Sequence, residues 1–237
     1  MRITEHAANA LLSFAFAGIL TASCNTASTS TVQTVAPQDE LVPPELINWV
    51  PYERNPVFSG TGEETWDRNI RERGYIIKEQ DKYHMWYTGY RGNASNPEMA
   101  LGYATSEDGI NWTRYPGNPV YDSMWVEDMM VVKHENVYYM FAEGRDDIAH
   151  LLTSTDKVTW TEHGPLDIRE TNGKPLTPGP YGTPTVFIDG DVWYLFYERN
   201  DEGIWLATSE DLKTWMNVQD GPVIRKGPSP YDKFGVA

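Results

Sequence analysis

The stretch TSEDGINW at residues 105–112 returns as TSTDKVTW at 153–160 and as TSEDLKTW at 208–215. The shared pattern is Thr-Ser-x-Asp-x-x-x-Trp, and its tryptophans lie 48 (160 minus 112) and 55 (215 minus 160) residues apart. This period is expected of a repeat array with four strands in each unit. The Ser and Asp can bond a turn backbone while the Trp covers the interior of the unit. The pattern therefore predicts scaffold in every copy, because a catalytic site is needed only once.

The similarity extends upstream of each copy, where aromatic segments recur every 55 residues. They read YHMWYTGY (83–90), YYMFAEGR (138–145) and WYLFYERN (193–200), and their alternation is typical of strands. A short β-branched or apolar run and a turn precede each of them. One unit thus contains an inner strand, an aromatic strand, a third strand and a Trp-bearing outer strand. We predict an all-β chain holding about three blades of a β-propeller.

Sequence patterns at the two ends of the array are partial. In NWVPYERNPVF (48–58) a Trp precedes an Asn by six residues, as in the segment 112–118, which predicts a closing outer strand. SPYDKFGVA (229–237) matches the start of another blade. Propellers typically have about 4–8 blades. We therefore expect a complete five-bladed protein to continue beyond Ala237.

The first 45 residues differ in composition from the rest. The apolar run ALLSFAFAGILTAS is too short for a membrane span and is typical of a signal peptide, so we assign 1–24 to one. LTASC resembles a bacterial lipobox and implies lipidation of Cys24; the alternative is an ordinary cleavage site. Residues 25–45 are small and polar, which predicts a flexible tether before the propeller at 46–237. We expect export, either as an outer-membrane or periplasmic lipoprotein or as a secreted protein.

The charge balance restricts the partners. The chain has 34 acidic and 19 basic residues, a net charge of −15, so its field repels nucleic acid. A neutral carbohydrate is not repelled by that field. The single cysteine excludes an intrachain disulfide, and no His-Glu-x-x-His spacing points to zinc. We predict a carbohydrate partner, no metal site and no required cofactor, and leave the oligomeric state open.

The starts of the three blades hold a charged cluster. Propeller ligands sit on the axis, where the innermost strands begin. Counting 55 residues back and forward from Asp128 gives Arg73 and Thr183, so matched positions differ between blades. The residues predicted to converge on the axis are Asp67, Arg71, Glu72, Arg73, Glu127 and Asp128.

A second group of charges lies at the ends of the aromatic segments. Thr88, Glu143 and Glu198 occupy one matched position, and Arg145 and Arg199 follow the two acids. Glycoside cleavage uses two carboxyl groups, one protonated to assist the leaving oxygen and one ionised to activate water or attack. Nearby arginines keep one carboxylate ionised while crowding raises the pKa of another. The alternative interpretation of each Glu–Arg pair is an inter-blade salt bridge.

The blade pattern resembles that of a known enzyme group. S-x-D-x-x-x-W together with YYMF-type strands and an Asp at the start of an inner strand resembles the five-bladed propeller glycoside hydrolases of families 43 and 32, over residues 46–237. The stretches IRERG, VEDMM and GPYGTP are similar to those of bacterial proteins described as glycosidase-like. The resemblance implies glycoside hydrolysis, and it leaves room for a structural calcium ion on the axis.

The catalytic residues of family 43 carry over only in part. That family takes a base from its first blade, an orienting Asp from the second and a Glu acid from the third. Asp128 matches the second-blade Asp. Arg73 stands at the first-blade position, and Gly182 or Thr183 at the third, where neither can donate a proton.

We therefore predict a glycosidase with Asp128 at its centre, Asp67 or Glu72 as base, and Glu198 as acid, with Glu143 as the other candidate acid. The predicted substrate-binding residues are Arg71, Arg73, Glu127, Arg145, Arg199, Trp66, Trp86, Trp125 and Tyr181. Two alternatives stay open. The repeat is close to the sialidase Asp-box S-x-D-x-G-x-T-W, and the absent third-blade acid favours a non-catalytic glycan-binding lipoprotein.

Overall fold

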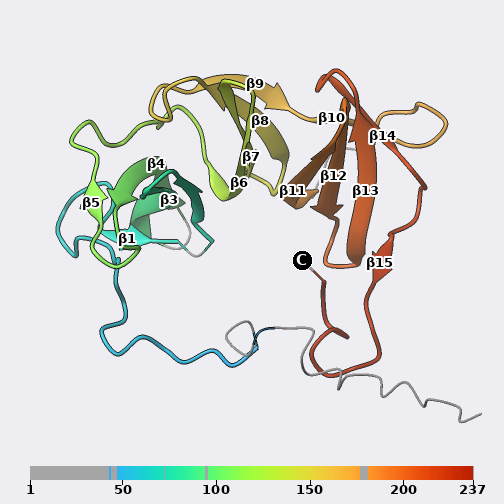
Figure 1. Cartoon of the computed structure of the whole chain (residues 1–237). Helices are drawn as coiled ribbons and strands as arrows, with labels where there is room; N and C mark the ends of the chain where they lie inside the picture. The colour runs from blue at the N-terminus through green and yellow to red at the C-terminus, as the bar shows by residue number, and fades with distance from the viewer. Residues whose placement is uncertain (1–42, 44–46, 72, 94–95, 177–180, 237) are drawn as a thin grey trace, which may run out of the picture. The chain divides into compact units, whose positions relative to one another are not determined.

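The computed structural model describes residues 43, 47–71, 73–93, 96–176 and 181–236 (Figure 1). The chain divides into two compact units, Met1–Val50 and Pro51–Ala237, and all strands described belong to the second. The predicted signal peptide with Cys24, and the tether apart from residue 43, lie outside the described residues. Within the described ranges there is no helix with the length and apolarity that crossing a membrane requires.

The strands form three sheets, one for each repeat (Figure 1). The first contains β1 (Asn69–Ile70), β2 (Tyr75–Glu79), β3 (Lys82–Asn93), β4 (Asn96–Ser106) and β5 (Thr113–Arg114). The second contains β6 (Glu127–His134), β7 (Val137–Glu143), β8 (Ala149–Ser154) and β9 (Thr161–Pro165). The third contains β10 (Asp167–Arg169), β11 (Gly182–Asp189), β12 (Val192–Glu198), β13 (Gly203–Ser209), β14 (Thr214–Asn217) and β15 (Ile224–Arg225).

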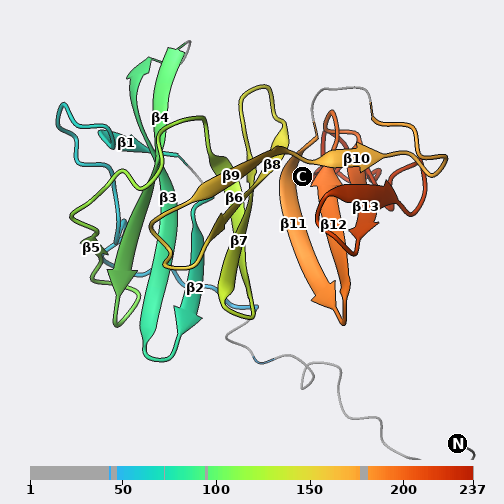
Figure 2. The ribbon, with the colours of Figure 1, turned by 90° about the horizontal axis from the view of Figure 1, so that it is seen from above.

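The innermost strands of the three sheets are neighbours. In the first sheet this strand is interrupted, because β1 and β2 both pair with β3, at Gly89 and Trp86 for example. β6 contacts both β2 and β11, and Figure 2 shows the sheets following one another in chain order. Sheets that are antiparallel, apart from the parallel β10–β14 pair, and that lie side by side through their inner strands are the blades of a propeller, so the predicted fold class is confirmed.

The aromatic segments are the second strands, β3, β7 and β12, as predicted. The predicted closing strand at 48–58 is wrong, because this segment forms no strand in the structure. It contains a turn in which the Asn55 amide donates to the Tyr52 carbonyl (3.1 Å). A strand needs a neighbouring edge to bond, and none of the described strands pairs with these residues.

Apolar clusters fill the space between neighbouring sheets. Trp86 of β3 and Met140 of β7 are fully buried between the first and second sheets. Phe141 of β7 and Trp215 of β14 are fully buried between the second and third. Successive residues of a strand point to opposite faces, so β7 serves both clusters. Truncating one such aromatic ring to Ala typically costs about 3–5 kcal/mol of stability.

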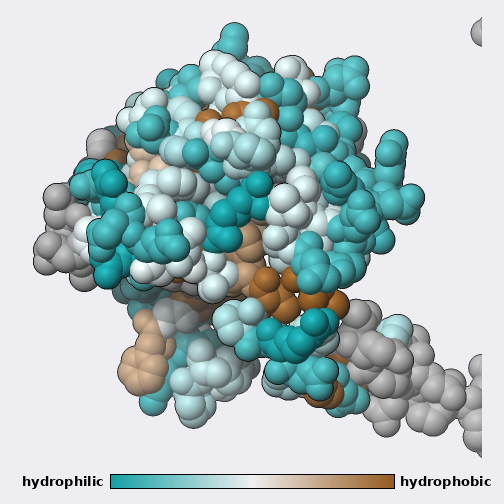
Figure 3. Space-filling model, turned by 90° about the vertical axis from the view of Figure 1, so that its left-hand side faces the viewer, coloured by the Kyte–Doolittle hydropathy of each residue, from teal (hydrophilic) through white to brown (hydrophobic). Residues whose placement is uncertain are grey.

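The face of the molecule drawn in Figure 3 is largely hydrophilic. On this face, polar residues predominate and apolar residues form only small patches. This surface agrees with the acidic balance of the sequence, 34 acidic against 19 basic residues.

The repeated octapeptide forms the same turn in every blade. In the first copy, the Ser106 hydroxyl accepts from the Gly109 amide (2.9 Å), and Asp108 Oδ1 accepts from the amides of Ile110 (2.8 Å) and Asn111 (2.7 Å). Corresponding bonds are made by Ser154 and Asp156 in the second copy and by Ser209 and Asp211 in the third. The repeat is therefore structural, as predicted.

Replacing Asp156 by Ala is expected to destabilise the protein by about 1 kcal/mol at neutral pH, the typical value for losing a side-chain cap of backbone amides. The pKa of Asp156 is lowered to about 2, and the hydrogen bond from the Thr159 amide is the largest cause. The carboxylate therefore contributes stability above its unfolded pKa near 4, and this contribution is lost as the pH falls toward 2. Denaturation of both proteins at several pH values tests this, with the exposed Glu210→Ala as control. A deficit that does not shrink at acidic pH would contradict it.

Candidate functional site

The innermost strands begin with the same backbone irregularity. Arg73, Asp128 and Thr183 all have positive φ, at 62°, 46° and 45°. The register shifts across the latter two, between Glu127 and Met130 in β6 and between Gly182 and Thr185 in β11. Bulges of this kind re-aim a side chain and are frequent beside active sites. The matched positions found in the sequence are thus matched in backbone shape.

Two arginines from the first sheet bind two acids of the second. Arg71 Nε lies 2.7 Å from Glu127 Oε2, and Arg73 Nη2 lies 3.1 Å from Asp128 Oδ2. The Asp128 side chain is 7% exposed and that of Arg73 51%, so the acids are buried beneath the arginines. Trp125 Nε1 also donates to Glu127 Oε1 (2.7 Å). Burial raises the pKa of Glu127, and Arg71 opposes that rise. These members of the predicted axial cluster do converge.

Glu143, at the end of β7, completes this group. Asp128 lies close enough to act on its side chain, and its Oε2 accepts from the Thr183 amide (3.2 Å). Burial and then the neighbouring Asp128 raise the pKa of Glu143 to about 8, against the effect of the Thr183 amide. Glu143 is therefore protonated at neutral pH, and Arg73 favours the negative charge on Asp128. The two form a carboxylic acid and carboxylate pair, called here the acidic pair.

Gly182 makes room for the acidic pair. A Cβ at this position would overlap Glu143 Oε1. Gly182 is one of the two positions, with Thr183, where the resemblance to family 43 expects a third-blade acid, and Glu143 of the second sheet lies against it. Sequence reasoning missed this contact. The available signal was a Gly at the position matched to Glu127.

Glu198, matched to Glu143 and predicted as the acid, bonds elsewhere. Its Oε1 accepts from the Asp201 amide in the loop after β12, and burial raises its pKa. Thr88 at the same matched position donates to the Val126 carbonyl (2.7 Å) of the next sheet. Thr88 and Glu143 thus each bond the main chain of the following sheet, whereas Glu198 bonds a loop of its own.

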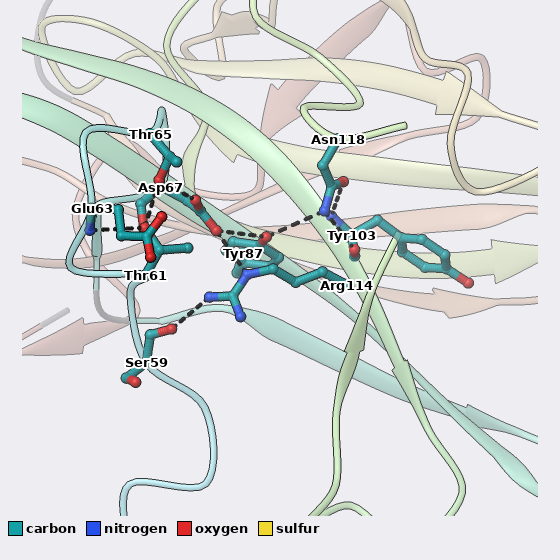
Figure 4. Close-up of polar contacts among 9 residues, drawn as sticks. All are labelled: Ser59, Thr61, Glu63, Thr65, Asp67, Tyr87, Tyr103, Arg114 and Asn118. Carbon is teal, nitrogen blue, oxygen red and sulfur yellow. Dashed lines mark hydrogen bonds and ion pairs between the residues drawn. The ribbon is translucent and has the colours of Figure 1, made fainter. Parts of the chain in front are cut away.

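Asp67, predicted as a base, does not join the acidic pair. Figure 4 shows its carboxylate between Arg114 and Tyr87. Arg114 Nε donates to it at 2.8 Å, the Tyr87 hydroxyl at 3.3 Å and the Thr65 hydroxyl at 3.0 Å. Arg114 belongs to the outer strand β5, so Asp67 ties the loop before β1 to that strand. Glu72, the other candidate base, lies outside the described residues.

Two of the four predicted sugar-stacking rings are packed inside the blades. Trp86 is fully buried and Tyr181 is 7% exposed, so neither offers a face to a ligand. Trp66 lies against Gly89 and Gly102 and stacks on Tyr87 at 5.7 Å. We remove Trp86 and Tyr181 from the candidates because packing covers them, whereas Trp66 is half-buried, as Trp125 is.

Trp125 is the aromatic ring that remains beside the acidic pair. It is half-buried, and the Arg145 guanidinium lies over it at 4.9 Å from the ring centre. Arg145 is exposed and follows Glu143 by two residues. Arg199 is half-buried, and its charge acts on Tyr181 and Tyr197. In the described part of the chain, no group of three or more His, Cys, Asp or Glu side chains is placed to hold a metal ion.

Curated relatives of the chain are mannoside phosphorylases by name. This chain is 27% identical over 197 residues to a 1,2-beta-oligomannan phosphorylase of Thermoanaerobacter sp. (strain X514), and the match covers 76% of this chain and 62% of that protein. It is 31% identical over 104 residues to a beta-1,2-mannobiose phosphorylase of the same organism, covering 38% of this chain and 34% of that protein. The chain thus spans less than two thirds of the length of either relative. No family model matches it.

Solved structures share the fold. One is described as a putative glycosidase from Bacteroides thetaiotaomicron VPI-5482, with TM-score 0.60, 18% identity and coverage of 78% of this chain and 64% of that one. Another represents the GH130 family of mannoside phosphorylases, described as containing glycoside hydrolases, with TM-score 0.50, 23% identity and coverage of 74% and 59%. The sequence predicted a glycoside hydrolase of the family 43 or 32 type, and it did not predict relatives that are named phosphorylases. The chain is a β-propeller with the fold of glycosidase-like proteins, and its curated relatives act on glycosidic bonds.

Proposed function

We propose that the protein cleaves a glycosidic bond and that the acidic pair supplies the proton. The observation that carries this proposal is the burial of Glu143 against Asp128 in the space that Gly182 leaves open. A carboxyl group kept neutral at neutral pH is what a general acid needs in order to protonate a leaving sugar oxygen. The names of the curated relatives favour β-1,2-linked mannosides as the substrate class.

Each member of the acidic pair has its own task in this proposal. Glu143 donates its proton to the glycosidic oxygen, and Asp128 keeps the pKa of Glu143 high enough for the proton to be present. Arg73 holds Asp128 in place through the 3.1 Å ion pair. As the bond breaks, the negative charge left on Glu143 is stabilised by the Thr183 amide (3.2 Å).

The attacking oxygen has to come from outside the acidic pair. In glycosidases the two carboxyl groups flank the bond at about 5 Å or more. Asp128 acts on Glu143 as a neighbouring charge, so in this proposal the two serve as a single proton source. Water activated by another base, or an external phosphate ion, would complete the reaction.

Phosphorolysis is the second candidate reaction. It is supported by the phosphorylase names of both curated relatives and by the arginines beside the acidic pair. Guanidinium groups bind phosphate oxygens in bidentate fashion. Arg145 presents such a group at the edge of the site, stacked on Trp125. An enzyme whose nucleophile is phosphate needs an acid of its own but no carboxylate nucleophile.

The product formed with and without phosphate tests both reactions. The protein is incubated with β-1,2-mannobiose and longer β-1,2-mannooligosaccharides in phosphate buffer and in phosphate-free buffer, and anomeric signals are followed by proton NMR. Free mannose in both buffers indicates hydrolysis, and mannose 1-phosphate in phosphate buffer alone indicates phosphorolysis.

Asp128→Asn is expected to slow product formation about tenfold at pH 9, because removing the neighbouring charge lowers the pKa of Glu143 from about 8 by about one unit, and above both values a tenfold smaller fraction of the acid stays protonated. The exposed Asp189→Asn serves as the matched control and is expected to keep full turnover. Binding of oligosaccharide without turnover in either buffer would contradict the proposal and favour a glycan-binding protein.

A further inference from the structure

A second polar site lies at the other end of the inner strands. The acidic pair is at the start of β6, whereas Glu79 and Lys133 are at the far ends of β2 and β6. Here a cavity of about 670 Å³ opens between the first and second sheets. The residues that matter in its lining are Glu79, Lys82, His84, Lys133, Tyr138 and Lys157.

One carboxylate in this cavity faces two ammonium groups. Lys133 Nζ lies 2.7 Å from Glu79 Oε1, and Lys157 Nζ lies 2.9 Å from Glu79 Oε2. The Tyr138 hydroxyl also donates to Glu79 Oε2 (2.7 Å). An ammonium group has three N–H donors. The lysines therefore keep donors in excess of what the contacts with Glu79 use.

The lining of the cavity is positive in a protein whose net charge is −15. Lys82, Lys133 and Lys157 contribute three positive charges and Glu79 one negative charge, a local balance of +2. Burial, and then the charge of Lys157, lowers the pKa of His84, so this side chain adds no charge at neutral pH. Asp81 and Glu107 line an adjoining cavity that Lys82 shares. Lys133 and Lys157 remain the centre of the positive field.

We propose that this cavity binds an oxyanion, namely a phosphate, sulfate or carboxylate group. An ion pair that only joined two sheets would need one lysine for one carboxylate and no adjacent space. The volume of about 670 Å³ falls in the range of small-molecule pockets, about 300–1,000 Å³. Glu79 occupies part of the donor set and competes with the incoming anion. This site is independent of the proposed glycoside cleavage, because it shares no residue with the acidic pair.

Calorimetric titration of the whole chain with sodium sulfate and sodium phosphate, at constant ionic strength, tests the proposal. The Lys133→Gln/Lys157→Gln double variant is expected to bind sulfate about tenfold more weakly or worse. Glu79→Gln is expected to bind it about 30-fold more tightly, the effect on a dianion of removing one repelling unit charge about 4 Å away in water. The exposed Lys213→Gln, in the third sheet, is the control and should bind like the parent protein. Glucuronate and glucose 6-phosphate distinguish an anion carried on a sugar from a free inorganic ion.

The opposite response of Glu79→Gln separates binding from structure. If Glu79 and its lysines only join two sheets, Glu79→Gln lowers stability and gives no gain in sulfate affinity. Lys82→Gln, which leaves the Glu79 contacts intact, is expected to weaken binding and covers the case in which the double variant fails to fold. Absence of sulfate binding in both the parent and Glu79→Gln would overturn the proposal. Equal binding in the parent, Lys82→Gln and the double variant would overturn it as well.

Discussion

Replacing Glu143 by Gln is expected to lower kcat for glycoside cleavage by about 10²- to 10⁴-fold, the usual contribution of a general acid. The change keeps the size of the side chain. The Gln carbonyl can still accept from the Thr183 amide, and its amide group can donate to Asp128. Folding is therefore preserved while the transferable proton is lost. Turnover of a β-1,2-mannooligosaccharide by both proteins measures the effect.

The pH dependence gives Glu143→Gln a second signature. Burial, with Asp128 beside it, raises the pKa of Glu143 to about 8, so the proton is present below that pH and activity should fall above it. Gln does not titrate, and the variant's residual activity should lack this fall. The stability of the fold should also fall as the pH rises. A carboxyl group with a raised pKa destabilises the fold as the pH rises from its unfolded value toward 8, so the variant should withstand alkaline pH better than the parent.

Glu198→Gln is the matched control. Glu198 occupies the aligned position in the third sheet and is 7% exposed, as Glu143 is. Its contact with the Asp201 amide places it in its own loop. A large loss of turnover in Glu198→Gln together with little loss in Glu143→Gln would return the role of acid to Glu198 and contradict the assignment made here.

The repeat made the fold predictable. Three copies of one turn pattern fix the blade period, and counting 55 residues from Asp128 located the matching positive-φ residues Arg73 and Thr183. These features depend on local backbone chemistry that a single chain repeats. The closing strand at 48–58 failed because a strand also needs a partner edge, which spacing alone does not supply.

The identity of the acid was not predictable in the same way. Glu143 and Glu198 align in sequence, yet one reaches the next sheet and the other bonds its own loop. The difference depends on side-chain direction and on the space left by Gly182. The prediction for Asp67 rested on its position in the sequence alone. It lies close to the bulge in sequence, but Arg114 and Tyr87 hold it within the first blade.

Replacing Gly182 by Ala is expected to lower kcat by about 10²-fold, although the added methyl group lies outside the chemistry. The Cβ would overlap Glu143 Oε1, so Glu143 must leave its contacts with Asp128 and the Thr183 amide. A misplacement of about 1 Å can cost a factor of this size. Gly182 does not have positive φ, so the backbone accepts Ala and the effect is steric. Overpacking is expected to cost about 1–3 kcal/mol of stability.

A double-mutant cycle shows whether the methyl group acts through Glu143. In the Glu143→Gln background the proton is already absent, so Gly182→Ala should lower kcat little further, and the two effects should be far from additive. Gly221→Ala is the control, because the nearest atom to its added Cβ is a flexible Arg225 nitrogen at 3.4 Å. Full additivity of the two changes would mean that Gly182 contributes by another route. Strong coupling would tie the glycine of the third sheet to the acid of the second, which is the arrangement that distinguishes this site from one with its acid in the third blade.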